Sequence, residues 1–192
     1  MHIYLLRHTR PDVPPETCYG QSDIDVVEST FRQDLEKLRE TLPLDQIQVI
    51  FTSPLQRCDK LARSLHHPRA TYITDQRIRE LNFGRWELMP WSQINGKELQ
   101  QWINDFRHAP APGGESHMDL YKRAEAFWQD LMRREEQHIL VVTHGGVMKS
   151  LLSLILEMPL EKSYAIKLSY SALIYTHYHE NAPQKVNFLC RG

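Results

Sequence analysis

The sequence is short of cysteine and has no long apolar run. The 192-residue chain holds three cysteines, an odd number, and none of them stands in a C-x-x-C pair. This usage favours free thiols in a reducing cytoplasm. The best apolar run, residues 151–156, is far too short to cross a bilayer, and the first residues show no signal-peptide pattern. We therefore expect a cytoplasmic protein that does not enter the membrane.

An excess of charge of either sign is also missing. Lysine and arginine together number 23 and aspartate and glutamate 24, which leaves a net charge of −1. This balance provides no global attraction to nucleic acid or to an acidic membrane, although it allows a local basic pocket. Apolar residues make up 41% of the chain and charged residues 24%, as in globular proteins. We predict one domain over residues 1–192, and nothing in the sequence indicates an oligomeric state.

Short apolar runs alternate with helical patterns along the chain. Buried parallel strands are predicted at "IYLL" (3–6), "IQVIF" (47–51) and "ILVV" (139–142). Apolar spacing predicts helices over 31–42, over 54–65 with Pro54 as the first residue, over 120–131 with a capping box from Ser116 to Asp119, and over 147–155. The alternation predicts an α/β fold, a three-layer α/β/α sandwich around a mostly parallel central sheet.

Two segments depart from this alternation. Residues 164–178, "YAIKLSYSALIYTHY", are rich in β-branched and aromatic side chains and predict a hairpin at the sheet edge. Residues 82–115 carry three of the four tryptophans and the stretch "APAPGGES". We predict that 82–115 is a lid-like excursion over the sheet rather than a separate domain.

Polar side chains follow each predicted strand at the point where it ends. The first strand is followed by Arg7 and His8, the second by "TSPLQR" with Arg57, and the third by "THGG" with His144. Ligands of open α/β sheets bind beyond these carboxyl ends. The two glycines allow backbone N–H groups at a helix N-terminus to approach an anion, and arginine matches phosphate with two parallel hydrogen bonds. Each pattern alone is common, but together they predict a receptor for a phosphate dianion.

A neutral imidazole in such a pocket is a competent nucleophile toward phosphorus and needs neither a metal nor another cofactor. The reaction also needs cationic donors and a general acid for the leaving oxygen. The segment "IRELNFGRWE" (78–87) offers Glu80 and Glu87 as the acid. The residues alone do not choose between them, and an ion pair with a neighbouring arginine is the more ordinary role for either.

Five motifs in this order resemble the histidine phosphatase superfamily, which has the phosphoglycerate-mutase-like fold. They are "LLRHT" (5–9), "FTSPLQRCDKLA" (51–62), "IRELNFGRWE" (78–87), "PGGES" (112–116) and "VVTHGG" (141–146). The resemblance implies that His8 is the phosphorylated nucleophile and Glu80 the proton donor to the leaving group. It also implies that Arg7, Arg57 and His144 form the rest of the phosphate pocket.

The chain departs from the family pattern in two motifs. Pro11 and Pro14 stand where the family usually has Thr and Asn, so two hydrogen bonds to phosphate are missing. The usual Gly after "WE" is Leu88, which is expected to alter the path of that loop. Replacements for the lost hydrogen bonds are offered by the backbone of Gly145 and Gly146 and by Gln21 and Ser22 in "CYGQSD".

The short chain favours hydrolysis over mutase chemistry, because mutases of the family resemble longer chains with inserted segments. The start "RHT-PDVP" followed by "CYGQSD" is similar to the α-ribazole phosphatase subgroup, which dephosphorylates α-ribazole 5′-phosphate in cobalamin synthesis. A flat base is expected to stack on a rim of aromatic side chains, for which Tyr19, Trp86, Trp91 and Trp102 are the candidates. Packing of the excursion itself explains these aromatics equally well.

Other interpretations remain open or fail on spacing. Phosphatases of another small metabolite and phosphoglycerate mutase-like phosphotransferases share the motifs. A magnesium-dependent aspartyl-phosphate motif should follow an apolar strand, and "DIDVV" (23–27) does not. A cysteine phosphatase needs five residues between its cysteine and its arginine, and only four separate Cys58 from Arg63. A zinc site of His8, His144 and Glu80 is disfavoured by the two arginines. A non-catalytic phospho-ligand binding module needs the arginines but neither His8 nor Glu80, so an enzyme acting on a small phosphorylated metabolite is favoured.

Overall fold

The computed structural model describes residues 1–179, 182 and 184–190, and these residues form a six-stranded sheet of order β3-β2-β4-β1-β5-β6. Strand β1 pairs in parallel with β4, β4 with β2, and β2 with β3, whereas β5 and β6 are antiparallel to their neighbours. The predicted mostly parallel sheet is therefore confirmed. The strands are β1 (His2–Arg7), β2 (Val49–Thr52), β3 (Thr71–Thr74), β4 (His138–Thr143), β5 (Leu173–His177) and β6 (Val186–Cys190).

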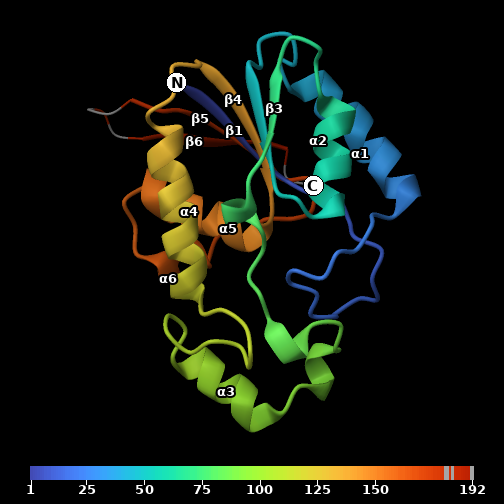
Figure 1. Cartoon of the computed structure of the whole chain (residues 1–192), viewed down its shortest axis with the longest axis vertical. Helices are drawn as coiled ribbons and strands as arrows, with labels where there is room; N and C mark the ends of the chain where they lie inside the picture. Colours follow the sequence, from blue (N-terminus) through green and yellow to red (C-terminus); the bar gives the residue numbers. More distant parts are fainter. Residues whose placement is uncertain (180–181, 183, 191–192) are drawn as a thin grey trace.

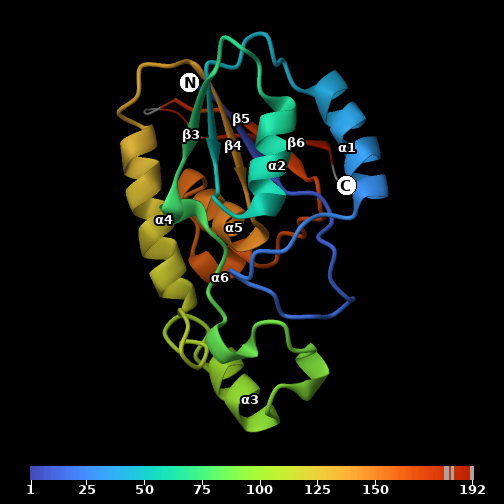
Figure 2. The ribbon, with the colours of Figure 1, turned by 45° about the vertical axis from the view of Figure 1, so that its right-hand side comes forward.

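Helices cover both faces of the sheet and complete the predicted three layers (Figures 1 and 2). Successive strand residues point to opposite faces. In β1, Ile3 and Leu5 pack with the helices α4 and α5, whereas Tyr4 and Leu6 pack with α1 and α2. Both faces are apolar, which is why the central strands are continuous apolar runs. The helices are α1 (Glu28–Thr41), α2 (Gln56–Leu65), α3 (Gly96–Asn104), α4 (His117–Leu131), α5 (Gly145–Ile155) and α6 (Leu160–Ser163).

The helix boundaries differ from the predictions mainly at N-termini. The capping box of α4 is confirmed, because Ser116 Oγ accepts from Asp119 N–H at 3.2 Å while the Asp119 carboxylate accepts from Ser116 N–H at 3.0 Å. Helix α2, however, begins at Gln56 rather than Pro54, because Leu55 is its N-cap in an extended conformation. No helix within the described residues is long and apolar enough to cross a membrane.

The predicted hairpin at 164–178 is wrong in position. The sheet does end in a hairpin, but its strands are β5 and β6, and β5 lies inside the sheet beside β1. Residues 164–168 instead follow α6 in turns, where Leu168 is buried in the core. Strand β3 was not predicted, because its four residues lie at the other edge and none of them is buried.

The segment 82–115 extends beyond the carboxyl ends of the parallel strands rather than over a face of the sheet (Figure 1). It holds α3 and two short 3₁₀ turns. Its own small apolar cluster joins Trp86, Ile94 and Ala111 to Cys18 from the loop after β1. The segment therefore stands at the edge of the sheet where the predicted phosphate pocket lies.

Candidate active site

The carboxyl ends of β1, β2 and β4 bring the predicted pocket residues together. His8 follows β1, and its N–H donates to the carbonyl of Thr143, the last residue of β4 (3.0 Å). His144 follows β4 and is the N-cap of α5, so the two imidazoles approach with ring centroids 5.1 Å apart. Arg57 lies in the first turn of α2, just after β2. Strand pairing thus places side chains from distant parts of the sequence in one site.

The His8 imidazole is held in one tautomer. Its Nδ1 lies 2.7 Å from the carbonyl oxygen of Thr9, and since a carbonyl only accepts, Nδ1 carries the hydrogen and Nε2 the lone pair. The side chain is 1% exposed. Burial, together with the positive charges of Arg57 and Arg7, lowers the pKa of His8 well below 6.5. At neutral pH His8 is therefore an uncharged imidazole with a free lone pair, the form that a nucleophile needs.

Two guanidinium groups lie beside this imidazole without a carboxylate partner. Arg57 is 0% exposed and donates to the carbonyls of Gly20 (2.6 Å) and Ser22 (2.8 Å). Arg7 donates to the carbonyl of Leu168, and its guanidinium carbon lies 4.3 Å from the centroid of a tyrosine ring, Tyr170. In each arginine the buried Nε–H has no partner among the described residues.

Neither arginine enters any ion pair among the described residues. Buried charges are normally paired, because removing an ion from water costs several kcal/mol. Buried Arg57 and half-buried Arg7, each with an unused buried donor beside one imidazole, are therefore suited to bind an anion. Gly145 lies against Arg7, since a Cβ on it would be 3.5 Å from the guanidinium carbon, so the N-terminus of α5 adds positive potential at the same place.

His144 is fully buried beside His8. Its Nε2 lies 2.8 Å from the hydroxyl of Ser53, and the Cys58 thiol lies 3.5 Å from the same nitrogen. Burial lowers the pKa of His144 well below 6.5, and the Arg57 charge and His8 lower it further. His144 is therefore neutral at pH 7 and is fixed in orientation by the residues that follow β2.

The structure separates Glu80 from Glu87. The Glu80 carboxylate accepts from the N–H of Gly146 at the start of α5 (3.1 Å) and from the N–H of Leu81 (2.8 Å). A Cβ on Gly146 would lie 2.3 Å from Glu80 Oε1, so the close approach requires glycine there. Glu87 accepts instead from the N–H groups of Gln21 (2.9 Å) and Phe83 (3.1 Å). Of the two carboxylates, only Glu80 thus contacts the N-terminus of α5, where the neighbouring Gly145 lies against Arg7.

The surface ion pair considered for these carboxylates is wrong for both of them. Arg77 pairs with Asp75 and Asp130, and neither Glu80 nor Glu87 forms an ion pair among the described residues. Both carboxylates accept mainly from backbone N–H groups instead.

An arginine that the sequence analysis missed holds the Glu80 backbone in place. Arg123 on α4 donates to the carbonyls of Glu80 (2.7 Å), Arg77 (2.7 Å) and Arg79, and to both oxygens of Glu115 (2.9 Å each). The three carbonyls lie 43 to 46 residues away from it in sequence, whereas Glu115 lies eight residues before it. A signal was present in the "PGGES" motif, whose Glu115 requires a cation once it is half-buried.

Gln21 and Ser22 do not present free side chains to a phosphate. Gln21 Nε2 donates to the carbonyl of Glu80 (2.9 Å), and the Ser22 hydroxyl donates to Glu87. Ser22 acts through its carbonyl, which orients Arg57. The expectation that these side chains replace the lost hydrogen bonds therefore finds no support in the geometry. The hydroxyl of Thr9, next to His8, is buried without a partner among the described residues, so its hydrogen-bonding capacity is unused.

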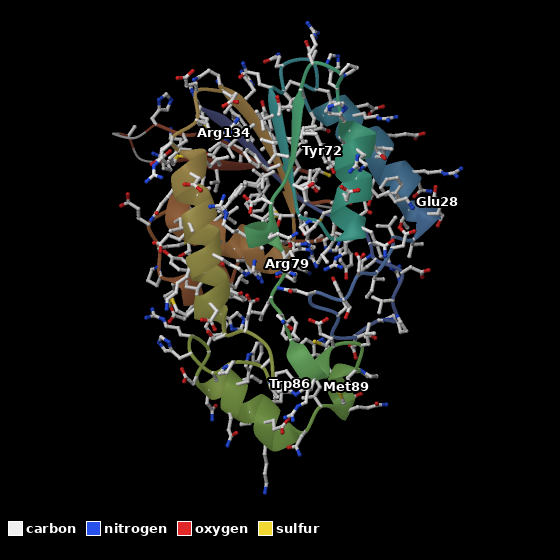
Figure 3. All side chains as sticks on the ribbon, viewed as in Figure 1. Glu28, Tyr72, Arg79, Trp86, Met89 and Arg134 are labelled. Atoms are coloured by element: carbon white, nitrogen blue, oxygen red, sulfur yellow. The ribbon has the colours of Figure 1, made fainter. Side chains whose placement is uncertain are left out.

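Of the predicted aromatic rim, Tyr19 faces the site and Trp86 does not. The Tyr19 ring lies 6.4 Å from the His8 ring, and its hydroxyl is 3.3 Å from that of Tyr170. Trp86 is 3% exposed and lies within the folded 82–115 segment (Figure 3), where its ring centroid is 5.8 Å from that of Trp102. Stacking of a ligand on Trp86 is therefore wrong for this structure, because the apolar cluster of the segment already covers the ring.

A second pocket opens beside the two tyrosines. It has a volume of about 340 Å³ and is lined by Arg10, Pro11, Val13, Pro14, Pro15, Glu16, Thr17, Tyr19 and Tyr170. Pro11 and Pro14, the two departures from the family motif, thus line a pocket wall rather than donate hydrogen bonds. Leu88, the third departure, keeps a backbone φ of 65°, the region that favours glycine. The loop therefore keeps a left-handed residue where the family has glycine.

From the lowered pKa values of three buried histidines, we expect the free energy of unfolding to fall on mild acidification. The pKa values of His8 and His144 lie well below 6.5, and burial lowers the pKa of His117 to about 4. Because the unfolded chain binds protons near pH 6.5 and the folded chain does not, stability is full above pH 6.5 and falls as the pH drops below it. Below pH 6.5, each such histidine lowers the free energy of unfolding by up to about 1.4 kcal/mol for every unit by which the pH falls.

Urea unfolding at pH 7.5, 6.5 and 5.5 measures this effect, and the midpoint should fall at the lowest pH. His117→Phe should weaken the dependence, because it removes one of the buried imidazoles. A midpoint that stays constant from pH 7.5 to 5.5 would contradict the assignment of neutral buried imidazoles.

Comparison with known proteins places these features in context. A family model described as histidine phosphatase superfamily (branch 1) matches residues 3–190. Phosphoserine phosphatase 1 of Hydrogenobacter thermophilus is 26% identical over 197 residues, which cover 98% of this chain and 92% of the relative. The adenosylcobalamin/α-ribazole phosphatase of Escherichia coli is 26% identical over 175 residues, 88% of this chain and 85% of the relative. The crystal structure of the α-ribazole phosphatase from Shigella flexneri superposes with a TM-score of 0.88 at 21% identity, covering 98% and 95% of the two chains.

Proposed function

The chain belongs to the histidine phosphatase superfamily and is a phosphatase, and we propose that it hydrolyses small phosphate monoesters through a phosphohistidine formed on His8, without a metal ion. One observation carries the proposal. A neutral buried imidazole with its lone pair on Nε2 lies beside the guanidinium groups of buried Arg57 and half-buried Arg7, whose buried Nε–H donors are unused and which have no ion-pair partner among the described residues. These arginines supply the positive charge that phosphoryl transfer requires.

In the first step, His8 Nε2 attacks phosphorus and a new N–P bond forms. The bond from phosphorus to the leaving oxygen breaks, and that oxygen keeps the electron pair and takes a proton from the Glu80 carboxyl group. Arg7, Arg57, His144 and the backbone of Gly145 bind the oxygens of the transferred group. In the second step, a water molecule gives a proton to Glu80 and attacks phosphorus, and the imidazole of His8 leaves.

α-Ribazole 5′-phosphate, an intermediate of cobalamin synthesis, is one candidate substrate. Supporting this choice are the likeness of the motifs to that subgroup and the similarity to the E. coli phosphatase. The pocket lined by Tyr19, Tyr170 and Pro14 lies beside His8 and offers a flat base two aromatic walls. Stacking there would contribute about 1–3 kcal/mol.

Hydrolysis of p-nitrophenyl phosphate in excess EDTA tests the proposed reaction. We expect full turnover in the chelator. Quenching in base, in which phosphohistidine survives, should trap a phosphoryl group on the peptide that contains His8. Loss of turnover in EDTA would instead indicate a metal-dependent reaction. Absence of turnover with any phosphate ester would indicate a binding module.

Glu80→Gln should slow poor leaving groups selectively. Phenyl phosphate needs a proton on its leaving oxygen, so we expect its kcat to fall by about 10²-fold or more. p-Nitrophenyl phosphate has a stable leaving anion and should be affected much less. The ratio of the two kcat values is the measurement, and Glu87→Gln is the matched control. Equal slowing of both esters by Glu80→Gln, or selective slowing by Glu87→Gln, would assign the acid elsewhere.

A further inference from the structure

The turn before β5 places Tyr170 against the phosphate pocket. Because β5 is antiparallel to β1, the residues that precede β5 run beside those that follow β1. Residues 169–172 form a turn that is closed by one backbone hydrogen bond. The N–H of Arg7 donates to the carbonyl of Ala172 (3.0 Å), and the preceding residue of the turn donates its N–H to the carbonyl of His8 (3.1 Å). The backbone that carries the nucleophile thus also holds this turn.

Ser171, the third residue of the turn, has a backbone conformation that ordinarily belongs to glycine. Its φ is 59°. Its N–H is the donor to the His8 carbonyl, and its hydroxyl donates to the Asp34 carboxylate on α1. This conformation is costly for serine, so it persists only where the surroundings fix it. The backbone of the neighbouring Tyr170 is therefore fixed by the fold as well.

Tyr170 presents its ring face to one arginine of the pocket and its hydroxyl to a second tyrosine. The Arg7 guanidinium carbon lies 4.3 Å from the centroid of the Tyr170 ring, and the His8 ring centroid lies 5.7 Å from it. The Tyr170 hydroxyl lies 3.3 Å from that of Tyr19. The Tyr19 ring in turn has the Arg57 guanidinium carbon 5.2 Å from its centroid. Two guanidinium–tyrosine pairs, joined through their hydroxyls, thus lie beside the nucleophile.

An aromatic face stabilises a guanidinium in a way that a carboxylate does not. A carboxylate would accept the N–H donors and offset the positive charge that a phosphoryl group needs. A ring face attracts the cation through its quadrupole and occupies none of the N–H donors in the guanidinium plane. This matches Arg7, which is half-buried without an ion pair among the described residues and keeps its buried Nε–H unused.

We propose that Tyr170 is a positioning residue of the phosphate pocket, whose ring holds the Arg7 guanidinium in place and leaves the Nε–H free for a phosphoryl oxygen. This role differs from that of a wall for the leaving group, because it acts on the transferred phosphoryl group through Arg7. The inference rests on the proposed phosphatase reaction and adds a residue to its pocket.

Vanadate and inorganic phosphate carry no leaving group, so they report on the phosphate pocket alone. Tyr170→Leu removes the ring face but keeps an apolar side chain, and we expect it to weaken inhibition by vanadate about 10-fold. The kcat/KM for glycerol 2-phosphate, an ester without a ring, should fall by about the same factor. Tyr170→Phe keeps the ring face and should stay within about 3-fold of the unmodified protein in both measurements. Tyr170→Met serves the same purpose where urea unfolding shows that Tyr170→Leu does not fold.

A double-mutant cycle measures whether Tyr170 acts through Arg7. Calorimetry of inorganic phosphate binding gives a Kd for each variant without any need for turnover. Tyr170→Leu should raise this Kd by about 10-fold when Arg7 is present. In the Arg7→Met background, where the guanidinium is absent, Tyr170→Leu should change the Kd by less than about 2-fold.

Tyr72→Leu is the matched control, because Tyr72 on the edge strand β3 also has a guanidinium over its ring, that of Arg63 at 4.7 Å. It should leave vanadate inhibition unchanged. The proposal is overturned if Tyr170→Leu leaves vanadate inhibition unchanged and slows only aromatic esters, since Tyr170 would then be a wall for the leaving group. An equal loss in Tyr170→Phe, or an undiminished effect of Tyr170→Leu in the Arg7→Met background, would also overturn it. Failure of the phosphatase proposal looks different, because no ester would be hydrolysed while phosphate binding still responded to Tyr170→Leu.

Discussion

We expect His8→Ala to lower kcat for p-nitrophenyl phosphate by about 10⁴-fold or more, because the atom that forms the covalent intermediate is removed. The arginines and the α5 N-terminus would remain, so phosphate should still bind. A wild-type-like inhibition constant for inorganic phosphate combined with a lost kcat is therefore the expected result. Steady-state kinetics and the base-quenched phosphoenzyme measurement together check it.

Two controls make this result specific. His108→Ala changes an exposed imidazole in the 82–115 segment and should leave kcat unchanged. Urea unfolding of His8→Ala shows whether the fold survives the loss of a buried ring, and substrate labelling of His8→Ala shows whether another residue accepts the phosphoryl group. A labelled His8→Ala protein, or one that retains full rate, would mean that His8 is not the nucleophile.

The layers of the fold were predictable because the central strands are buried on both faces. A strand covered by helices on both sides must be apolar at every position, so β1, β2 and β4 stand out as short apolar runs. Strand β3 has no such signal, since it lies at the edge with no buried residue. The hairpin was misplaced for a related reason. Residues 164–168 are apolar or aromatic except for Lys167, but they lie in turns outside the sheet, where Leu168 is buried in the core and Ile166 packs against it.

The positions of the phosphate pocket were predictable because they depend on strand ends. Parallel strands deliver whatever follows them to one edge, so His8, Arg57 and His144 could be brought together without knowledge of the pairing order. The choice between Glu80 and Glu87 is different in kind. It depends on the close approach of the Glu80 carboxylate to Gly146, a contact across 66 residues of sequence. No local pattern encodes such a distance.

Residues that act through remote partners were missed for the same reason. Arg123 is an ordinary helical arginine until its four backbone and carboxylate partners from 77–80 and 115 are seen around it. Trp86 was a candidate for the pocket rim because a flat base would stack on aromatic side chains, and packing of the excursion was the equal alternative. The structure shows instead that Trp86 and Ile94 form the core that a 34-residue excursion needs in order to fold.

Arg57→Lys should lower kcat/KM by about 10²- to 10³-fold although the charge is kept. The guanidinium of Arg57 is anchored by two donors on the carbonyls of Gly20 and Ser22, and its Nε–H remains unused. A lysine ammonium has three donors at a single point, so it cannot hold both carbonyls and also present an N–H in the position that Nε occupies. We therefore expect weaker inhibition by phosphate and by vanadate, which mimics the trigonal-bipyramidal state.

Arg63→Lys is the matched control, because Arg63 lies on the same helix but is exposed and pairs with Asp59. Kinetics with both variants separate the loss of the forked guanidinium donors of Arg57 from any general effect of the substitution on α2. The loss should appear in kcat as well as in KM, since the negative charge on the phosphoryl oxygens is redistributed in the transition state and the fixed fork is positioned for that state. If Arg57→Lys stays within about 3-fold of the unmodified protein, a simple positive charge suffices and the argument from unused guanidinium donors fails.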